Sequence, residues 1–159
     1  MQAAIIGVSG QPPATCPVMR LVIDSRLSEI RRAGEMVDAF RARHGLADED
    51  ADALHVVLDE VLSNAIRHGL GGDASHAITV TLELAEGEIL IEVEDDGLAY
   101  DPTQAAAPVL AASLDERRDG GLGMAFVRGL TDGIEYRRID GRNRLALRRR
   151  LREKSPPGR

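Results

Sequence analysis

The chain of 159 residues has one cysteine, one lysine and no tryptophan, and only 3% of its residues are aromatic. Cys16 has no partner for an internal disulfide, and nothing around it marks a reactive thiol. Aromatic platforms for stacking single-stranded nucleic acid are scarce, and the net charge of −6 opposes binding to a phosphate backbone. We therefore expect no nucleic-acid partner.

Long apolar runs are also absent. No run approaches the roughly 20 residues that span a bilayer, and the first residues lack the basic start and apolar stretch of a secretory signal. We expect a cytoplasmic protein with no membrane partner. The basic run at 148–152 is either a basic patch or the solvated end of a strand, and we favour the solvated strand end.

Length and composition predict one domain, because 43% hydrophobic residues supply a core for a chain of this size but not for two. Three prolines in residues 1–17 predict a flexible leader there. The domain is expected at 18–151, followed by a disordered basic tail at 152–159.

Two periods alternate along the chain, one typical of helices and one typical of strands. Helices are expected at about 24–43, 48–69 and 120–130, and strands at 19–23, 78–84, 89–93, 133–139 and 144–151. Turns are expected at Glu86-Gly87 and at Asp140-Gly141, each between two consecutive strands. Asp24 or Ser25 is expected to cap the first helix, Gly45 to end it, and Asp48 or Asp50 to start the second. The sum is an α+β fold, a two-layer sandwich of three helices on a mostly antiparallel mixed sheet.

Glu60, Asn64 and His68 lie at four-residue spacing on the second predicted helix. Each is rotated by about 40° from the last, so they form a slanted polar stripe beside the apolar face. Such a stripe can offer polar groups to a ligand. The alternatives are a solvated helix edge for Glu60 and Asn64, and a helix end favoured by the dipole for His68.

Asp95 ends a predicted strand, and Gly97 follows two positions later. A partly buried carboxylate can accept a hydrogen bond from an adenine amino group, and a glycine lets a flat ring approach the backbone. An Asp-x-Gly turn explains the same residues.

The segment Gly120-Gly121-Leu122-Gly123 leads into a predicted helix that continues with Met124. Successive backbone N–H groups at a glycine-rich helix N-terminus bind phosphate. A flexible hinge is the alternative. A functional interpretation assigns Mg²⁺ to the Asn64 carbonyl oxygen and the orientation or deprotonation of a nucleophile to Glu60.

In this order the motifs resemble those of the Bergerat-fold (GHKL) ATP-binding domains of histidine kinases, gyrase-like ATPases and anti-sigma factor serine kinases. Glu60-x-x-x-Asn64-Ala-x-x-His68 is similar to the N box, Asp95-x-Gly97 to the adenine box, and Gly121-x-Gly123 to the phosphate loop. The chain most resembles the small anti-sigma factor serine/threonine kinases, because the N box opens with Glu and no dimerisation helix precedes it.

The resemblance implies ATP and Mg²⁺ as cofactors, Glu60 as the general base and Asn64 as the metal ligand. Further nucleotide contacts are implied for Asn64, His68, Asp95, Gly97, Gly121, Leu122, Gly123 and Met124. Arg117 or Arg118 lies in a predicted loop or lid, at 98–119, where the family often offers an arginine to phosphate. Ala99 replaces the second glycine of the adenine box, at a cost of about 1 kcal/mol if that position needs a positive φ.

The resemblance implies a kinase that phosphorylates a serine or threonine of a small anti-anti-sigma (STAS-type) protein and sequesters a sigma factor, with a homodimer as a further option. Walker-type and protein-kinase-type architectures are excluded because the one lysine is Lys154, in the tail. One alternative is a non-catalytic, nucleotide-gated binding switch. Another is a detached histidine kinase catalytic domain, although none of the four histidines has the context of a phosphoacceptor.

Overall fold

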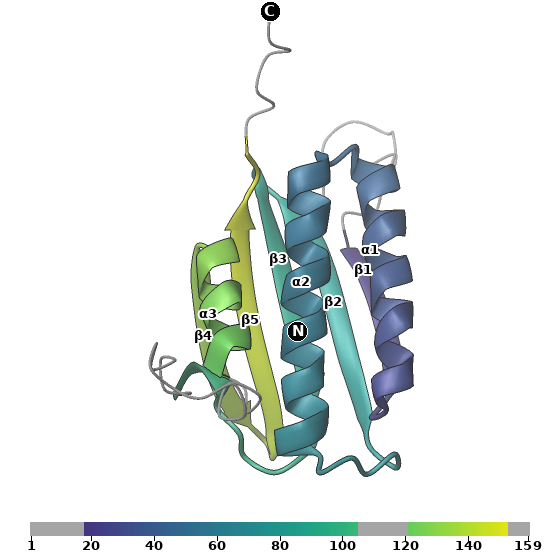
Figure 1. Ribbon diagram of the computed structural model, residues 1–159, viewed down its shortest axis with the longest axis vertical. Helices are drawn as coiled ribbons and strands as arrows, with labels where there is room; N and C mark the ends of the chain where they lie inside the picture. The colour runs from purple at the N-terminus through teal and green to yellow at the C-terminus, as the bar shows by residue number, and fades with distance from the viewer. Residues whose placement is uncertain (1–17, 105–120, 153–159) are drawn as a thin grey trace, which may run out of the picture.

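The computed structural model describes residues 18–104 and 121–152, which form a helical layer on one face of a sheet (Figure 1). The strand order is β1-β2-β3-β5-β4. The strands are β1 (Val18–Asp24), β2 (Ala77–Ala85), β3 (Glu88–Asp95), β4 (Gly133–Ile139) and β5 (Arg142–Arg150). The α-helices are α1 (Ile30–His44), α2 (Asp48–Asn64) and α3 (Gly121–Leu130).

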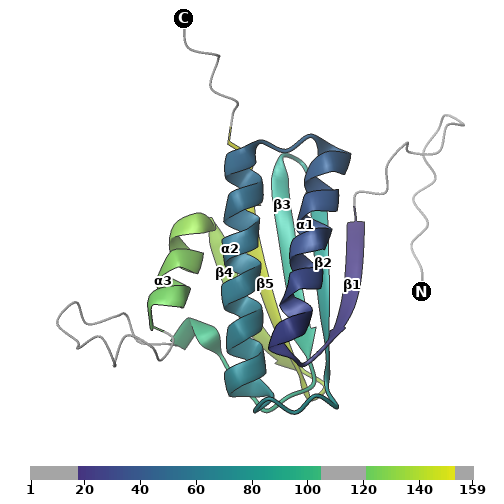
Figure 2. The same ribbon diagram turned by 45° about the vertical axis from the view of Figure 1, so that its right-hand side comes forward.

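The predicted two-layer sandwich is confirmed. Figure 2 shows α1 over the β1 end of the sheet, α3 over the end that carries β4, and α2 between them. Within the described ranges every strand pairing is antiparallel. None of the helices in these ranges combines the length and the apolar character that a bilayer span requires.

Two tight turns set the register of the sheet. Glu86 and Gly87 join β2 to β3 with φ values of 51° and 79°, and Asp140 and Gly141 join β4 to β5 with 50° and 77°. A positive φ at both central residues is typical of the hairpin turn that matches strand twist. Both turns are predicted by the sequence, and the second one determines how β5 pairs with β4.

The start of α1 differs from the prediction. A 3₁₀ turn, η1 (Leu27–Glu29), precedes the helix, and neither Asp24 nor Ser25 caps it. Instead the pairing of β1 with β2 continues to Asp24, and the Ser25 N–H donates to the His76 carbonyl at 2.9 Å. Strand pairing therefore carries the backbone past the predicted cap. Gly45 ends α1 with a φ of 63°, as predicted.

The prediction of a solvated strand end at 148–152 is wrong for Arg149. Its side chain is 2% exposed, and its Nε donates to Asp50 Oδ1 at 2.9 Å. Its Nη1 donates to the Leu130 carbonyl at 2.8 Å. Alternation along β5 places Arg149 on the helix side of the sheet with Leu145 and Leu147. The pair therefore joins the first turn of α2 to β5 and to the end of α3.

The predicted apolar face of α2 forms the centre of the core. Its residues are Leu54, Val57, Leu58, Val61 and Leu62, and Ala65 continues this face into the turn after the helix; all are buried. Because this face packs on the sheet, the polar residues beside it are held at the edge of the core.

Candidate functional site

The second half of α2 carries Glu60 and Asn64 to one end of the helical layer. After Asn64 the chain makes a π-helical turn, η2 (Ala65–Gly69), and ends at Gly69 as predicted. Single π turns are rare in proteins, and those that occur are often found at functional sites. Because a π turn is wider than an α turn, His68 leaves the predicted stripe. It is exposed, and its ring stacks on that of Tyr100 with centroids 5.3 Å apart.

Asn64 is the buried member of the stripe, with 6% of its surface exposed. Among the described residues its Nδ2 atom has no hydrogen-bond partner. A buried amide without a partner costs about 1–3 kcal/mol. The carboxamide therefore fits a ligand that accepts from its N–H or, with oxygen and nitrogen exchanged, a hard cation such as Mg²⁺.

Asp95 lies at the end of β3 and is 5% exposed. Its Oδ1 accepts hydrogen bonds from the Gly97 N–H and from Asn143 Nδ2, both at 2.8 Å. Within the described part of the chain, hydrogen bonds reach only this oxygen of the carboxylate. Asp95 is thus fixed in orientation while one oxygen is left for another donor.

Gly97 is needed because the backbone of η2 lies against it. A Cβ atom on Gly97 would come within 2.6 Å of both the Gly69 carbonyl oxygen and Leu70 Cδ2. The next residue, Leu98, donates its N–H to the same Gly69 carbonyl at 2.9 Å. The loop after Asp95 therefore packs directly on the end of the predicted N box.

A small cavity lies between α2, η2 and the strand ends. Its lining includes Asn64, Asp95, Tyr100, Tyr136 and Asn143. The cavity volume is about 20 Å³, which is room for about one water molecule. A purine could enter only if a wall such as the Tyr100 side chain moved. Burial, followed by the charge of Asp101, raises the pKa of Tyr100, so its hydroxyl stays protonated at neutral pH.

Glu60 lies next to the glycine motif, on the side of α2 that faces α3. The helix α3 begins at Gly121, so Gly121, Leu122 and Gly123 supply N–H groups that have no partner within the helix. A Cβ atom on Gly123 would come within 2.0 Å of Glu60 Oε2. Leu122 is exposed, whereas the Met124 side chain is fully buried in the core. Met124 can therefore offer a ligand only its backbone.

The predicted lid arginines fall outside the described ranges. Arg117 and Arg118, with Gly120 and most of the predicted lid, belong to 105–120. The short 3₁₀ helix η3 (Pro102–Gln104) is the last described part before this gap. Arg128 of α3 donates to the Thr103 carbonyl at 2.8 Å and so ties η3 to the glycine-rich helix.

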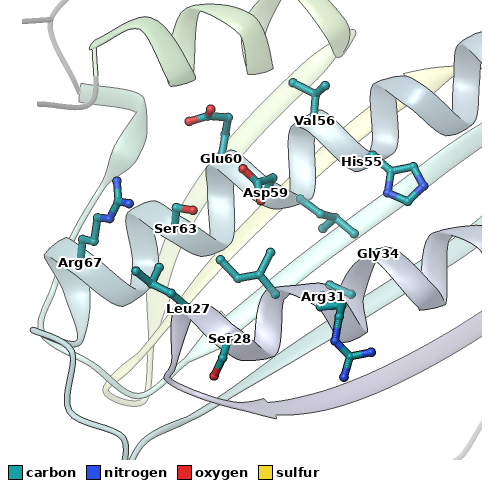
Figure 3. Close-up of a pocket in the computed structure, with 13 residues that line it drawn as sticks. Leu27, Ser28, Arg31, Gly34, His55, Val56, Asp59, Glu60, Ser63 and Arg67 are labelled. Carbon is teal, nitrogen blue, oxygen red and sulfur yellow. The ribbon is translucent and has the colours of Figure 1, made fainter. Parts of the chain in front are cut away.

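An open groove lies between α1 and α2 on the solvent side, with a volume of about 820 Å³ (Figure 3). Glu60 lies at the edge of this groove that faces α3. Asp59 and Ser63 of α2 also line the groove, and so does Arg67 of η2. Glu60 is therefore accessible from the groove as well as adjacent to the start of α3.

Two polar residues of the site were not found by sequence reasoning. Asn143 pairs with Asp95 in the register of β3 and β5, and the Tyr136 hydroxyl donates to Asn143 Oδ1 at 2.7 Å. A polar residue on the inward face of β5, in alternation with Leu145 and Leu147, was the available signal.

Ala99 carries no backbone strain. Among the described non-glycine residues a positive φ occurs at Glu86 and Asp140, in the two hairpin turns. Ala99 is exposed and has no positive φ. The cost expected for a left-handed alanine therefore does not arise in this structure.

Comparison with known proteins agrees with this geometry. Residues 23–149 match the model of the histidine kinase-like ATPase domain. The chain belongs to this family.

Two curated proteins of known name are similar to this chain. The chain is 39% identical to the serine/threonine-protein kinase BtrW of Bordetella bronchiseptica over 94 residues, which are 59% of this chain and 66% of that kinase. The chain thus spans just under two thirds of that relative. It is 27% identical to the anti-sigma F factor of Clostridium perfringens over 116 residues, 72% of this chain and 83% of that protein.

A solved structure shows the same fold. The crystal structure of the RsbU and RsbW domains of Rv1364c from Mycobacterium tuberculosis matches with a TM-score of 0.63 and 20% identity. The match covers 87% of this chain and 33% of that one. The likeness supports the architecture of the domain.

Proposed function

We propose that this chain is an ATP-dependent serine/threonine kinase of the anti-sigma factor type. Its substrate is a small anti-anti-sigma (STAS-type) protein, and its second partner is a sigma factor. The family assignment and the relatives named as serine/threonine-protein kinase and anti-sigma F factor support this proposal. The observation that carries it is the contact of Glu60 with Gly123, which joins a carboxylate to a phosphate-binding type of helix start.

In this proposal three groups hold the nucleotide. Asp95 accepts a hydrogen bond from the adenine amino group, and the first turn of α3 donates its N–H groups to phosphate oxygens. The Asn64 carboxamide oxygen would hold Mg²⁺, which would supply positive charge against the transferring phosphate. Arg117 or Arg118 is proposed as a further phosphate contact from the resemblance alone.

Glu60 acts on the acceptor hydroxyl. Because it lines the open groove, a serine or threonine side chain can reach it from solvent without entering the purine cavity. The hydroxyl oxygen forms a bond to the γ-phosphorus, the bond to the leaving ADP breaks, and the proton passes to the Glu60 carboxylate. The transition state of such transfers is loose, so orientation of the hydroxyl contributes more than proton removal.

One assay tests the proposal. Labelled ATP, Mg²⁺ and STAS-type proteins from the same genome are incubated with the wild type and with Asn64→Ala and Glu60→Gln. Both variants are expected to transfer far less phosphate, whereas Asp52→Asn is expected to stay near wild type. Asp52 is the matched control because it is an exposed carboxylate on the same helix, about two turns before Glu60, and does not line the groove.

The nucleotide-gated switch is the competing function. Ala99 and the atypical predicted lid are the two features that favour it, and the unstrained backbone at Ala99 removes the first of them. Wild-type protein that binds Mg·ATP but phosphorylates none of these proteins would contradict the kinase and favour the switch. We also propose that the protein acts in the cytoplasm, where a sigma factor is found.

A further inference from the structure

We propose that Asn143 is a positioning residue that determines which nucleobase the site accepts. By occupying one oxygen of Asp95, it leaves a single acceptor for a purine amino group and so favours adenine over guanine nucleotides. This inference rests on the proposed function in one respect, namely that Asp95 receives the nucleobase.

The Asn143 carboxamide uses its full hydrogen-bonding capacity. Its Nδ2 donates to Asp95 Oδ1 and to the Leu98 carbonyl, each at 2.8 Å. Its Oδ1 accepts from the Tyr136 hydroxyl at 2.7 Å and from Arg138 Nη1 at 2.8 Å. A primary amide has two N–H donors and an oxygen with two lone pairs, so no capacity is left for a ligand.

These partners also determine the orientation of the amide. A carboxylate and a carbonyl lie on one side of it and can only accept, whereas an arginine on the other side can only donate. Exchanging oxygen and nitrogen would face acceptor with acceptor and donor with donor. Arg138 also donates to the Gly97 carbonyl at 3.1 Å, which fixes the loop after Asp95 to the β4–β5 hairpin.

The consequence falls on Asp95. Its Oδ1 already accepts from the Gly97 N–H and from Asn143, which uses both lone pairs. Oδ2 alone is left for a ligand within the described part of the chain. A carboxylate recognises guanine best through both oxygens, one for the ring N–H and one for the exocyclic amino group. Adenine presents one amino group on that edge and needs one oxygen.

Asn143 therefore blocks the two-oxygen mode. Removing the N–H groups of Asn143 frees Asp95 Oδ1 to accept from a second donor. This strengthens the binding of guanine, whereas adenine still makes a single hydrogen bond to Asp95. A purely structural role for Asn143 would instead weaken both nucleotides alike. The ratio of the two dissociation constants separates these roles.

The experiment is calorimetric titration of Mg·ATP and Mg·GTP into the wild type, Asn143→Leu, Asn143→Thr and Tyr136→Phe. We expect Asn143→Leu to reduce the ratio of the GTP dissociation constant to the ATP dissociation constant at least about fivefold. This is the lower end of the discrimination that a good bidentate contact to a base provides. Asn143→Thr keeps one hydroxyl donor and should retain most of the preference. Tyr136→Phe removes one hydrogen bond that holds the Asn143 amide in place but keeps the amide itself. It should change the ratio of the two dissociation constants in the same direction by a smaller amount.

Two controls make the result decisive. Arg142→Gln, an exposed change on the same strand, should leave the ratio unchanged, and thermal unfolding of each variant reports whether it is folded. If Asn143→Leu does not fold, Tyr136→Phe decides the question. A folded Asn143→Leu or Tyr136→Phe with the wild-type ratio would overturn this inference and leave the kinase in place. A wild type that binds neither nucleotide would overturn the proposed function itself.

Discussion

The carboxylate of Glu60 lies so close to Gly123 that a Cβ atom on the glycine would come within 2.0 Å of Oε2. An anion next to the first turn of a helix is stabilised by the free N–H groups and the helix dipole. Phosphate would use the same N–H groups. The Glu60 carboxylate and the phosphate would repel each other at this position unless a cation lay between them. Binding of Mg²⁺ and the position of Glu60 are therefore coupled in the proposed site.

Gly123→Ala should impair phosphate transfer without unfolding the protein. The new methyl group meets the flexible end of Glu60, which can swing away, so the fold survives while the carboxylate is displaced. A misplacement of about 1 Å can cost up to about a hundredfold in rate, and we expect a loss of at least about tenfold. Gly129→Ala is the matched control on α3, because a Cβ atom on Gly129 would meet nothing within 4 Å. Equal transfer rates for the two variants would refute the prediction.

Removing either partner of the buried pair Asp50–Arg149 should strongly destabilise the protein. Arg149→Met leaves a carboxylate with 1% exposure and no cation, so the free energy of unfolding should fall by about 3–5 kcal/mol. Urea denaturation measures this loss. Arg150→Met is the neighbouring control, since Arg150 is 74% exposed and its pair with Glu88 should contribute at most about 1 kcal/mol.

The double variant Asp50→Leu/Arg149→Met tests the mechanism of that loss. Replacing a buried ion pair by apolar residues is often neutral or stabilising, so the double variant should be more stable than Arg149→Met alone. A double variant that is no more stable than Arg149→Met would show that the unpaired carboxylate of Asp50 is not the main cause of the loss.

Ala99→Gly should not improve nucleotide binding. Because Ala99 has no positive φ, glycine relieves no strain and adds freedom to the unbound loop, at a cost of about 0.5–1 kcal/mol. The dissociation constant for Mg·ATP should rise by no more than about fivefold. Gly97→Ala gives the opposite case in the same loop, because its methyl group would meet the backbone oxygen of Gly69 and should abolish binding. Tighter binding by Ala99→Gly would contradict this account.

The layers and the three motifs could be predicted from sequence because they depend on local signals. Apolar periodicity located the strands and helices, and two Gly-containing turns marked the hairpins. Arg149 and Asn143 could not be predicted, because both are polar residues on the inward face of β5. Their partners, Asp50 and Asp95, are far away in sequence and are identified only by strand register and helix packing. The π turn after Asn64 leaves no trace in apolar periodicity either.

Glu94 should make part of the stability depend on pH. Hydrogen bonding by Arg144, with a smaller contribution from Arg142, lowers the pKa of Glu94 although burial opposes the shift. A carboxyl whose pKa is lower in the folded state contributes stability above its unfolded pKa and loses it as pH falls through the folded pKa. Glu94→Gln should therefore cost about 1 kcal/mol at pH 7 and almost nothing in strong acid, where the wild-type side chain is also neutral.

Urea denaturation of both proteins between neutral and acid pH checks this dependence. Glu135→Gln is a suitable control, because Glu135 pairs with Arg137 on the exposed edge of β4 and its side chain is 59% exposed. Salt should shrink the Glu94 effect at pH 7, since the arginine partners are partly exposed. A difference between wild type and Glu94→Gln that stays constant down to strong acid would mean that packing, and not the charge, is what the glutamate contributes.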